Sequence, residues 1–152
     1  MADAKTLKSR LASGEFDARL KEVYLSDKAV EDQKKRDAVI IDEFVRLFGD
    51  NDSIELFSAP GRTEVGGNHT DHNHGKVLAA SVDLDTVAAA AKRDDGIIVE
   101  KSFKFDALEV DISDLEVHTE EFGKSSGLIR GMCAGFKERG YNIGGFNGGS
   151  MS

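Results

Sequence analysis

The stretch Ser58-Ala-Pro-Gly-Arg-Thr-Glu-Val-Gly-Gly-Asn-His-Thr-Asp-His-Asn-His-Gly75 is the most distinctive part of this chain of 152 residues. It holds the only proline, three of the four histidines and many short polar side chains. Apolar segments at 54–57 and 77–84 flank it, and each predicts a strand. Folds commonly place binding and catalytic side chains on a polar loop held between strands. We therefore expect the function of the chain to depend on this loop.

Upstream of the loop, the sequence predicts helices. Residues 1–26 are strongly charged, with sparse leucines, which predicts one or two surface helices. A longer amphipathic helix is predicted over about 27–48, because Ile40, Phe44 and Phe48 recur at every fourth position. One face of that helix is expected to be buried.

Downstream of the loop, short apolar runs predict further strands at 77–84, 87–91, 97–99 and 108–112. Asp94-Asp95-Gly96 predicts a hairpin turn that joins the strands on either side of it. A second helix is predicted from Ser125 or Ser126 to Gly140, because apolar side chains recur there at intervals of three and four residues. A last strand is expected only to begin at 143–146. This order of elements predicts an α+β fold.

Composition excludes several classes of function. The net charge of −8 opposes general binding to nucleic acid or to an anionic membrane, since both need basic patches. No apolar run approaches the roughly 20 residues of a membrane span. The first residues hold no apolar segment, so no signal peptide is expected, and the single Cys133 cannot form an internal disulfide. A cytoplasmic protein of one domain's length is expected.

The histidines of the loop allow a metal site as one hypothesis. His69, Asp71, His72 and His74 fall within six residues, and imidazole and carboxylate groups are ligands of zinc, manganese or iron. The spacing resembles the His-rich loop of metallo-β-lactamase-type hydrolases, but the order of the residues differs. A solvent-exposed polar loop without metal is the simpler interpretation, and no metal ligand is assigned.

Taken whole, the stretch resembles the signature of galactokinases. The galactokinase pattern runs Ala-Pro-Gly-Arg, four residues, Gly-Glu-His-Thr-Asp-Tyr, a short turn with glycine, and Val-Leu-Pro. The matching positions are Ala59, Pro60, Gly61, Arg62, Gly67, His69, Thr70, Asp71, Asn73, Gly75, Val77 and Leu78. So many matches within twenty residues are specific, and the resemblance extends over about 38–146.

The resemblance implies a GHMP-type sugar kinase, of the group with homoserine, mevalonate and phosphomevalonate kinases. It implies ATP-dependent phosphorylation of galactose or a related sugar at the anomeric hydroxyl, with Mg²⁺. Arg62 matches the arginine that offsets charge developing in phosphoryl transfer, although a surface ion pair is the commoner fate of an arginine. The sugar contacts implied are Asn68, His69, Thr70 and Asp71, whose groups can hydrogen-bond a small-molecule sugar.

The chain departs from the galactokinase pattern at several positions. The glutamate before the histidine is replaced by Asn68, the asparagine after the arginine by Glu64, the tyrosine by His72 and the proline by Ala79. Asn68 falls on an implied sugar contact and replaces a charged acceptor with an amide. The departures therefore bear on which sugar is bound.

The resemblance covers only the N-terminal part of a galactokinase. The serine-rich phosphate loop of that family is not found, and the glycine-rich 144–152 is followed by no helix, so no cofactor-binding residue is assigned. We expect a chain cut off before the phosphate loop: a helical extension at 1–37, and an incomplete kinase domain at 38–152 with the signature at 59–78. Such a chain is expected to be inactive alone and to self-associate through an incomplete sheet. The alternative interpretations are a non-catalytic sugar-binding or regulatory protein and the metal-dependent hydrolase.

Overall fold

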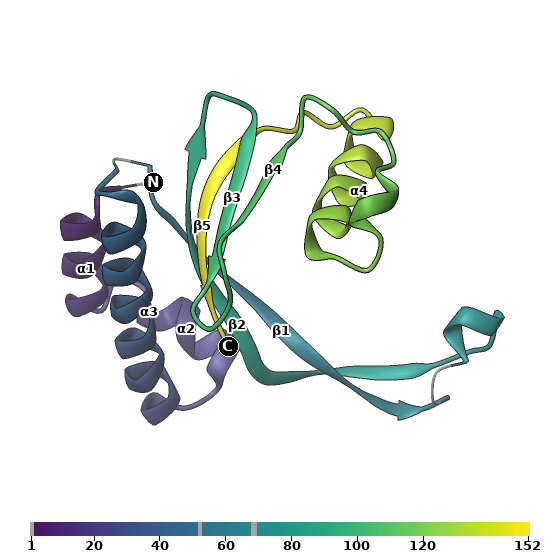
Figure 1. The fold of residues 1–152 in the computed structure, drawn as a ribbon. Coiled ribbons are helices and arrows are strands. Elements are labelled where there is room, and N and C mark those ends of the chain that lie inside the picture. The colour runs from purple at the N-terminus through teal and green to yellow at the C-terminus, as the bar shows by residue number, and fades with distance from the viewer. Residues whose placement is uncertain (1, 52, 68–69) are drawn as a thin grey trace.

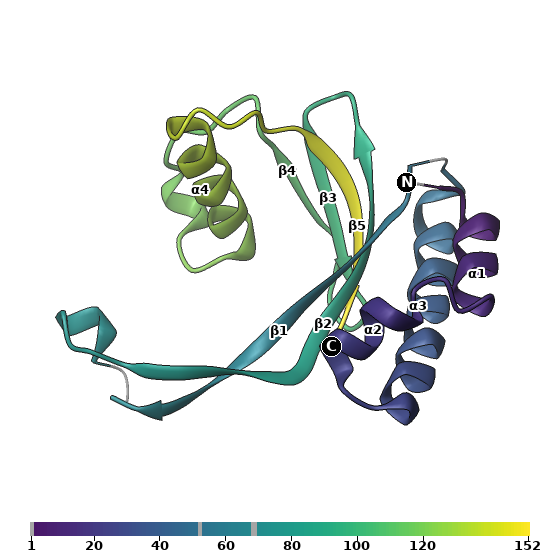
Figure 2. The same cartoon turned by 180° about the vertical axis from the view of Figure 1, so that it is seen from behind.

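A computed structural model describes residues 2–51, 53–67 and 70–152, and of Asp71 the backbone alone. A mixed sheet of five strands forms its centre. Helices α1, α2 and α3 lie on one side of this sheet and α4 lies on the other (Figures 1 and 2). The predicted α+β class, a mixed sheet with packed helices, is confirmed.

The N-terminal helices are α1 (Ala4–Ala12), α2 (Asp17–Tyr24) and α3 (Asp27–Phe48). The Ser26 hydroxyl caps α3 by accepting a hydrogen bond from the Ala29 amide at 3.1 Å, which satisfies one of the free amides of the first turn. The helix ends at Gly49, whose φ of 79° falls in the left-handed region that glycine adopts readily. The helix predicted over about 27–48 is confirmed.

The strands are β1 (Glu55–Gly66), β2 (Leu78–Arg93), β3 (Ile97–Ser102), β4 (Leu108–Asp111) and β5 (Gly145–Met151). They lie in the order β1-β2-β5-β3-β4, with β3 and β5 parallel and the other neighbours antiparallel. Two predictions about this sheet are wrong. The turn at 94–96 does not make a hairpin, because β5 lies between β2 and β3. The strand expected only to begin at 143–146 instead runs over Gly145–Met151 in the middle of the sheet.

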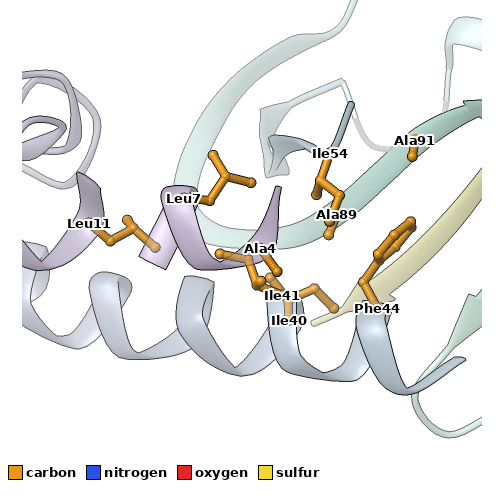
Figure 3. Packing of buried hydrophobic residues seen from close by; sticks show 9 residues of the cluster. All are labelled: Ala4, Leu7, Leu11, Ile40, Ile41, Phe44, Ile54, Ala89 and Ala91. Atoms are coloured by element: carbon orange, nitrogen blue, oxygen red, sulfur yellow. The ribbon is translucent and has the colours of Figure 1, made fainter. Parts of the chain in front are cut away.

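The larger hydrophobic core lies between α1, α3 and the sheet (Figure 3). Its buried members come from helices and strands far apart in sequence: Ala4, Leu7, Leu11, Ile40, Ile41, Phe44, Ile54, Ala89 and Ala91. Two helices within residues 1–26 are confirmed, but their predicted surface position is wrong for α1. Its leucines Leu7 and Leu11 are only 4% exposed, because they face the apolar stripe of α3.

A smaller core lies beneath α4 (Ser125–Glu138), which packs on the β3–β4 side of the sheet. Ile98, Val110 and Ile112 are buried there. The outer side of α4 leaves Leu128 and Met132 more than half exposed. Within the described residues, each helix is too short or too polar to cross a lipid bilayer.

Beyond the sheet, β1 and β2 continue as a two-stranded ribbon formed by 59–66 and 78–86 (Figure 1). In this part β2 pairs with β1 alone, whereas 87–93 of β2 also pair with β5. The loop predicted at 58–75 is therefore wrong over 58–66, which is strand. Polar residues suit a ribbon exposed on both faces, and Pro60 is tolerated because β1 is an edge strand.

Candidate functional site: the ribbon, its loop and its base

The ribbon carries the distinctive sequence out from the body of the molecule, and its register shifts where the motif begins. The shift falls between Pro60 and Arg62, so Pro60 pairs with Asp85 and Arg62 with Ser81. A Cβ at Gly61 would lie 3.0 Å from the Leu84 carbonyl oxygen. The glycine therefore allows the two backbones to approach at this irregular point.

Arg62 lies on the exposed shaft of the ribbon and forms no ion pair with another described residue. The surface ion pair that is the commoner fate of an arginine is thus not formed among those residues, and Glu64 does not pair with Arg62. The tip loop begins after Gly66, the last residue of β1. Gly66 lies four positions beyond Arg62, which is about 13 Å at the usual rise of a strand. Within the described part of the chain, no carboxylate competes for the guanidinium when an anionic group approaches the ribbon.

Thr70 organises the loop at the tip. Its carbonyl oxygen accepts hydrogen bonds from the amides of Asn73 and Gly75, and its hydroxyl donates to the Lys76 carbonyl at 3.3 Å. The Thr70 amide in turn donates to the Gly67 carbonyl at 3.0 Å. These bonds close a compact turn around the short helix η1 (Asp71–Asn73).

Two motif glycines are needed for that turn. Gly67 has φ of +98°, and a Cβ on it would lie 2.5 Å from the Lys76 carbonyl oxygen. A Cβ on Gly75 would lie 2.4 Å from the Cβ of Thr70. Such distances are too short for any other residue without a backbone shift. The spacing of glycines in the motif is thereby explained by the path of the loop.

The structure describes some of the predicted site residues and not others. Arg62 is on the shaft and Thr70 in the loop, while Asn68 and His69 lie outside the described residues. Asp71 begins η1 with its backbone alone described. Among the described side chains no three His, Cys, Asp or Glu groups gather as metal ligands would. The histidine-rich cluster itself falls partly outside that range, so the metal hypothesis is not tested.

The base of the ribbon holds a polar network that sequence reasoning missed. Asp85 of β2 accepts hydrogen bonds from the Tyr24 hydroxyl at 2.5 Å, the Ser58 hydroxyl at 2.6 Å and the Arg36 guanidinium at 2.7 Å. Burial alone would raise the pKa of Asp85, but these donors hold it below its ordinary value. Burial and the hydrogen bond to Asp85 raise the pKa of Tyr24 to about 12.

A second buried polar pair sits beside this network. On α3, Gln33 is 3% and Asp37 6% exposed, and the Gln33 amide donates to Asp37 at 2.8 Å. Burial raises the pKa of Asp37 above its ordinary value. The sequence does hold a signal for this pair, because Gln33 and Asp37 lie at the spacing of three and four residues that the buried stripe keeps toward Ile40.

The glycine-rich end of the chain does not fit a phosphate cradle. Phosphate is held by free backbone amides of a loop or helix N-terminus. Residues 145–151 instead form β5, paired with β2 on one side and β3 on the other. Their amides belong to the ladder of the sheet, so no step that requires ATP is assigned to them.

Comparison with known proteins places this ribbon within a known motif. Residues 42–92 match the family model of the galactokinase galactose-binding signature. That range contains the end of α3, all of β1, the tip loop and nearly all of β2. The matched family motif therefore coincides with the projecting ribbon and its support.

Galactokinases are also similar over a longer part of the chain. The galactokinase of Lactococcus lactis subsp. cremoris is 33% identical over 109 residues, covering 70% of this chain and 27% of the relative. That of Bacillus subtilis is 31% identical over 103 residues, covering 66% and 26%. The chain thus spans about a quarter of the length of these relatives.

A solved structure shares the fold. The crystal structure of Lactococcus lactis galactokinase complexed with galactose superimposes with a TM-score of 0.64 and 32% identity. The match covers 76% of this chain and 30% of that one. The resemblance to the N-terminal part of galactokinases is confirmed.

Proposed function

We propose that this chain is the sugar-binding part of a galactokinase-like sugar kinase and that the ribbon loop contacts galactose or a related sugar. The observation that carries the proposal is the match of residues 42–92 to the galactose-binding signature, which coincides with the ribbon. The similar galactokinase structure is complexed with galactose, which further supports a sugar as the ligand.

The residue roles follow from the chemistry of sugars. A sugar ring presents hydroxyls that donate and accept, so carboxylate, imidazole and amide groups bind it by paired hydrogen bonds. In this proposal Asp71, His69 and Asn68 supply those groups, and the Thr70 bonds hold the loop that carries them. Asn68 offers a neutral amide where the galactokinase pattern has a carboxylate. This difference changes which arrangement of sugar hydroxyls the loop prefers.

Arg62 has a different proposed role. Phosphorylation of the anomeric hydroxyl builds negative charge between the sugar oxygen and the transferred phosphoryl group. A guanidinium without an ion-pair partner among the described residues is suited to offset that charge. ATP and Mg²⁺ would supply the phosphoryl group and its charge neutralisation, and no described residue is assigned to hold them.

The test is a titration of the purified chain with D-galactose, followed by NMR of the protein amides, with D-glucose as the comparison sugar. We expect shifts in the amides of 66–77 and weaker binding to Asp71→Asn by about tenfold, the value of a charged hydrogen bond. His74→Asn is the matched control, because His74 lies in the same loop at φ 60° and asparagine tolerates that conformation.

Two results would overturn the proposal. One is an unchanged spectrum of the loop at saturating galactose; the other is equal weakening in Asp71→Asn and His74→Asn. Arg62→Ala separates binding from catalysis, because a charge that acts in the transition state should change galactose affinity by less than about threefold. Galactose binding without any ATP binding by the intact natural protein would favour the non-catalytic sugar-binding alternative.

A further inference from the structure

A cavity of about 680 Å³ lies between α2, α3 and the base of the ribbon. In both views of the fold, α2 lies between α3 and the start of the ribbon (Figures 1 and 2). Apolar side chains of α2 and β1, among them Leu20, Val23 and Leu56, form much of the wall. Tyr24, Asp37 and Ser58 contribute polar groups to the same cavity. The lining contains no residue of the tip loop, so a ligand bound in the cavity would not contact the loop proposed to bind sugar.

Asp37 is the unusual group in this cavity. Its side chain is buried, with the residue only 6% exposed. Oδ1 accepts the hydrogen bond from Gln33, and Oδ2 accepts none from any described residue. A buried carboxylate whose only hydrogen-bond donor among the described residues is neutral is costly to keep ionised. Burial accordingly raises the pKa of Asp37, more than Gln33 and the charge of Arg36 lower it. Asp37 and Tyr24 both line the cavity, and the negative charge of Asp37 contributes to raising the pKa of Tyr24.

The neighbouring hydroxyls are left as acceptors. Tyr24 and Ser58 each have one hydroxyl proton, and each donates it to Asp85. Their oxygens lie 3.2 Å apart and keep lone pairs for another donor. The polar side of the cavity thus presents three acceptor groups. The Tyr24 and Ser58 hydroxyls have already donated their protons to Asp85, and the ionised Asp37 carboxylate has no proton to donate.

Asp37 forms no direct ion pair with a described residue, although the nearby Arg36 guanidinium acts to lower its pKa. Arg36 of α3 is occupied by Asp85, at 2.7 Å, and Arg19 of α2 pairs with Glu22 at 2.8 Å on the solvent side. Asp83 of β2 also lines the cavity and forms no ion pair with a described residue. The lining therefore favours a cation over an anion.

We propose that this cavity binds a primary ammonium group on a short apolar stem. An ammonium has three N–H donors, which match the carboxylate of Asp37 and the hydroxyl oxygens of Tyr24 and Ser58. The stem lies along the apolar wall formed by Leu20, Val23 and Leu56. The bound cation supplies the direct ion-pair partner that Asp37 lacks among the described residues.

The test uses n-butylamine hydrochloride as the probe and n-butanol, which has the same length without charge, as its neutral match. Both are titrated into the full chain labelled with ¹⁵N and followed by amide NMR at pH 7. We expect butylamine to bind on the order of tenfold more tightly than butanol and to shift amides around Tyr24, Asp37 and Ser58.

Asp37→Asn removes the charge and keeps a side chain of the same shape that can still accept from Gln33. It is expected to lose the preference for the amine over the alcohol. Asp32→Asn is the matched control on the same helix, since Asp32 makes only an exposed pair with Lys35 at 3.2 Å. That variant should retain the preference, although it changes the net charge by the same amount.

The pH dependence gives an independent readout. Butylamine stays protonated throughout, so its affinity should fall on acidification as Asp37 takes up a proton, through a range above the ordinary carboxyl pKa. In Asp37→Asn this dependence should disappear. Equal binding of amine and alcohol to the unsubstituted chain, or amide shifts confined to another surface, would overturn the proposal even if Asp37→Asn failed to fold.

Discussion

At the scale of single residues, Tyr24 joins the N-terminal helices to the sheet. Its ring is buried at the end of α2, and its hydroxyl meets Asp85 and Ser58 on the two strands of the ribbon base. Arg36 of α3 reaches the same carboxylate. One aspartate thus receives donors from two helices and a strand, which fixes the position at which the ribbon leaves the body.

Tyr24→Phe tests the strength of this connection. The change keeps the ring and removes one donor from the buried Asp85 carboxylate, so we expect the free energy of unfolding to fall by about 1–2 kcal/mol. Urea denaturation measures it. Tyr141→Phe is the control, because that ring is 62% exposed and its hydroxyl bonds to no described residue. Equal stability of Tyr24→Phe and the control would show that the network contributes nothing.

At the scale of elements, β5 completes the sheet despite a sequence with weak strand propensity. Gly145-Phe-Asn-Gly-Gly-Ser-Met151 holds three glycines, yet it pairs along its length with β2 and β3. Pairing on both sides supplies hydrogen bonds that no local preference provides. At Gly145 the backbones approach closely, since a Cβ there would lie 2.5 Å from the Ile97 carbonyl oxygen.

Gly145→Ala is therefore expected to destabilise the chain by about 2 kcal/mol or more, because the contacted atoms are backbone of β3 and cannot move aside cheaply. Thermal unfolding followed by circular dichroism gives the difference. Gly144→Ala offers a matched control one residue earlier, where an added Cβ meets nothing within 4 Å. Its stability should be unchanged or slightly increased. If both variants melted alike, the close approach of β5 to β3 would be wrong.

At the scale of the whole molecule, α1 is part of the main core. Leu7 and Leu11 pack with Ile40 and Ile41 of α3 and with Ala89 of β2 (Figure 3). The boundary predicted at residue 37 between a helical extension and a kinase domain stays a prediction. Packing of α1 on α3 nevertheless means that residues 1–37 contribute to the stability of the rest.

Leu7→Ala measures that contribution. Loss of a leucine side chain that is 4% exposed should cost about 2–4 kcal/mol and lower the midpoint for the whole chain in one transition. Leu84→Ala, at a leucine 77% exposed on the ribbon, should change stability by less than about 0.5 kcal/mol. A chain whose sheet melted at the same midpoint with and without Leu7 would contradict a shared core.

The exposed face of α4 also belongs to this scale. Leu128, Met132 and Phe136 lie at spacing four and are each more than half exposed. This is a larger apolar surface than scattered single residues make. Self-association of the chain, expected from the sequence, stays a prediction to which this face is relevant.

Periodicity and motif spacing were enough to predict α3, α4, the strand at 108–112 and the resemblance to galactokinases. These features depend on residues close in sequence, where side chains at three, four or two positions share a face and a motif keeps its own order. The position of β5 between β2 and β3, the extension of β1 through 58–66, and the meeting of Tyr24, Arg36, Ser58 and Asp85 were not predictable in this way. They depend on pairing between segments as much as about 60 residues apart, for which local propensity carries no information.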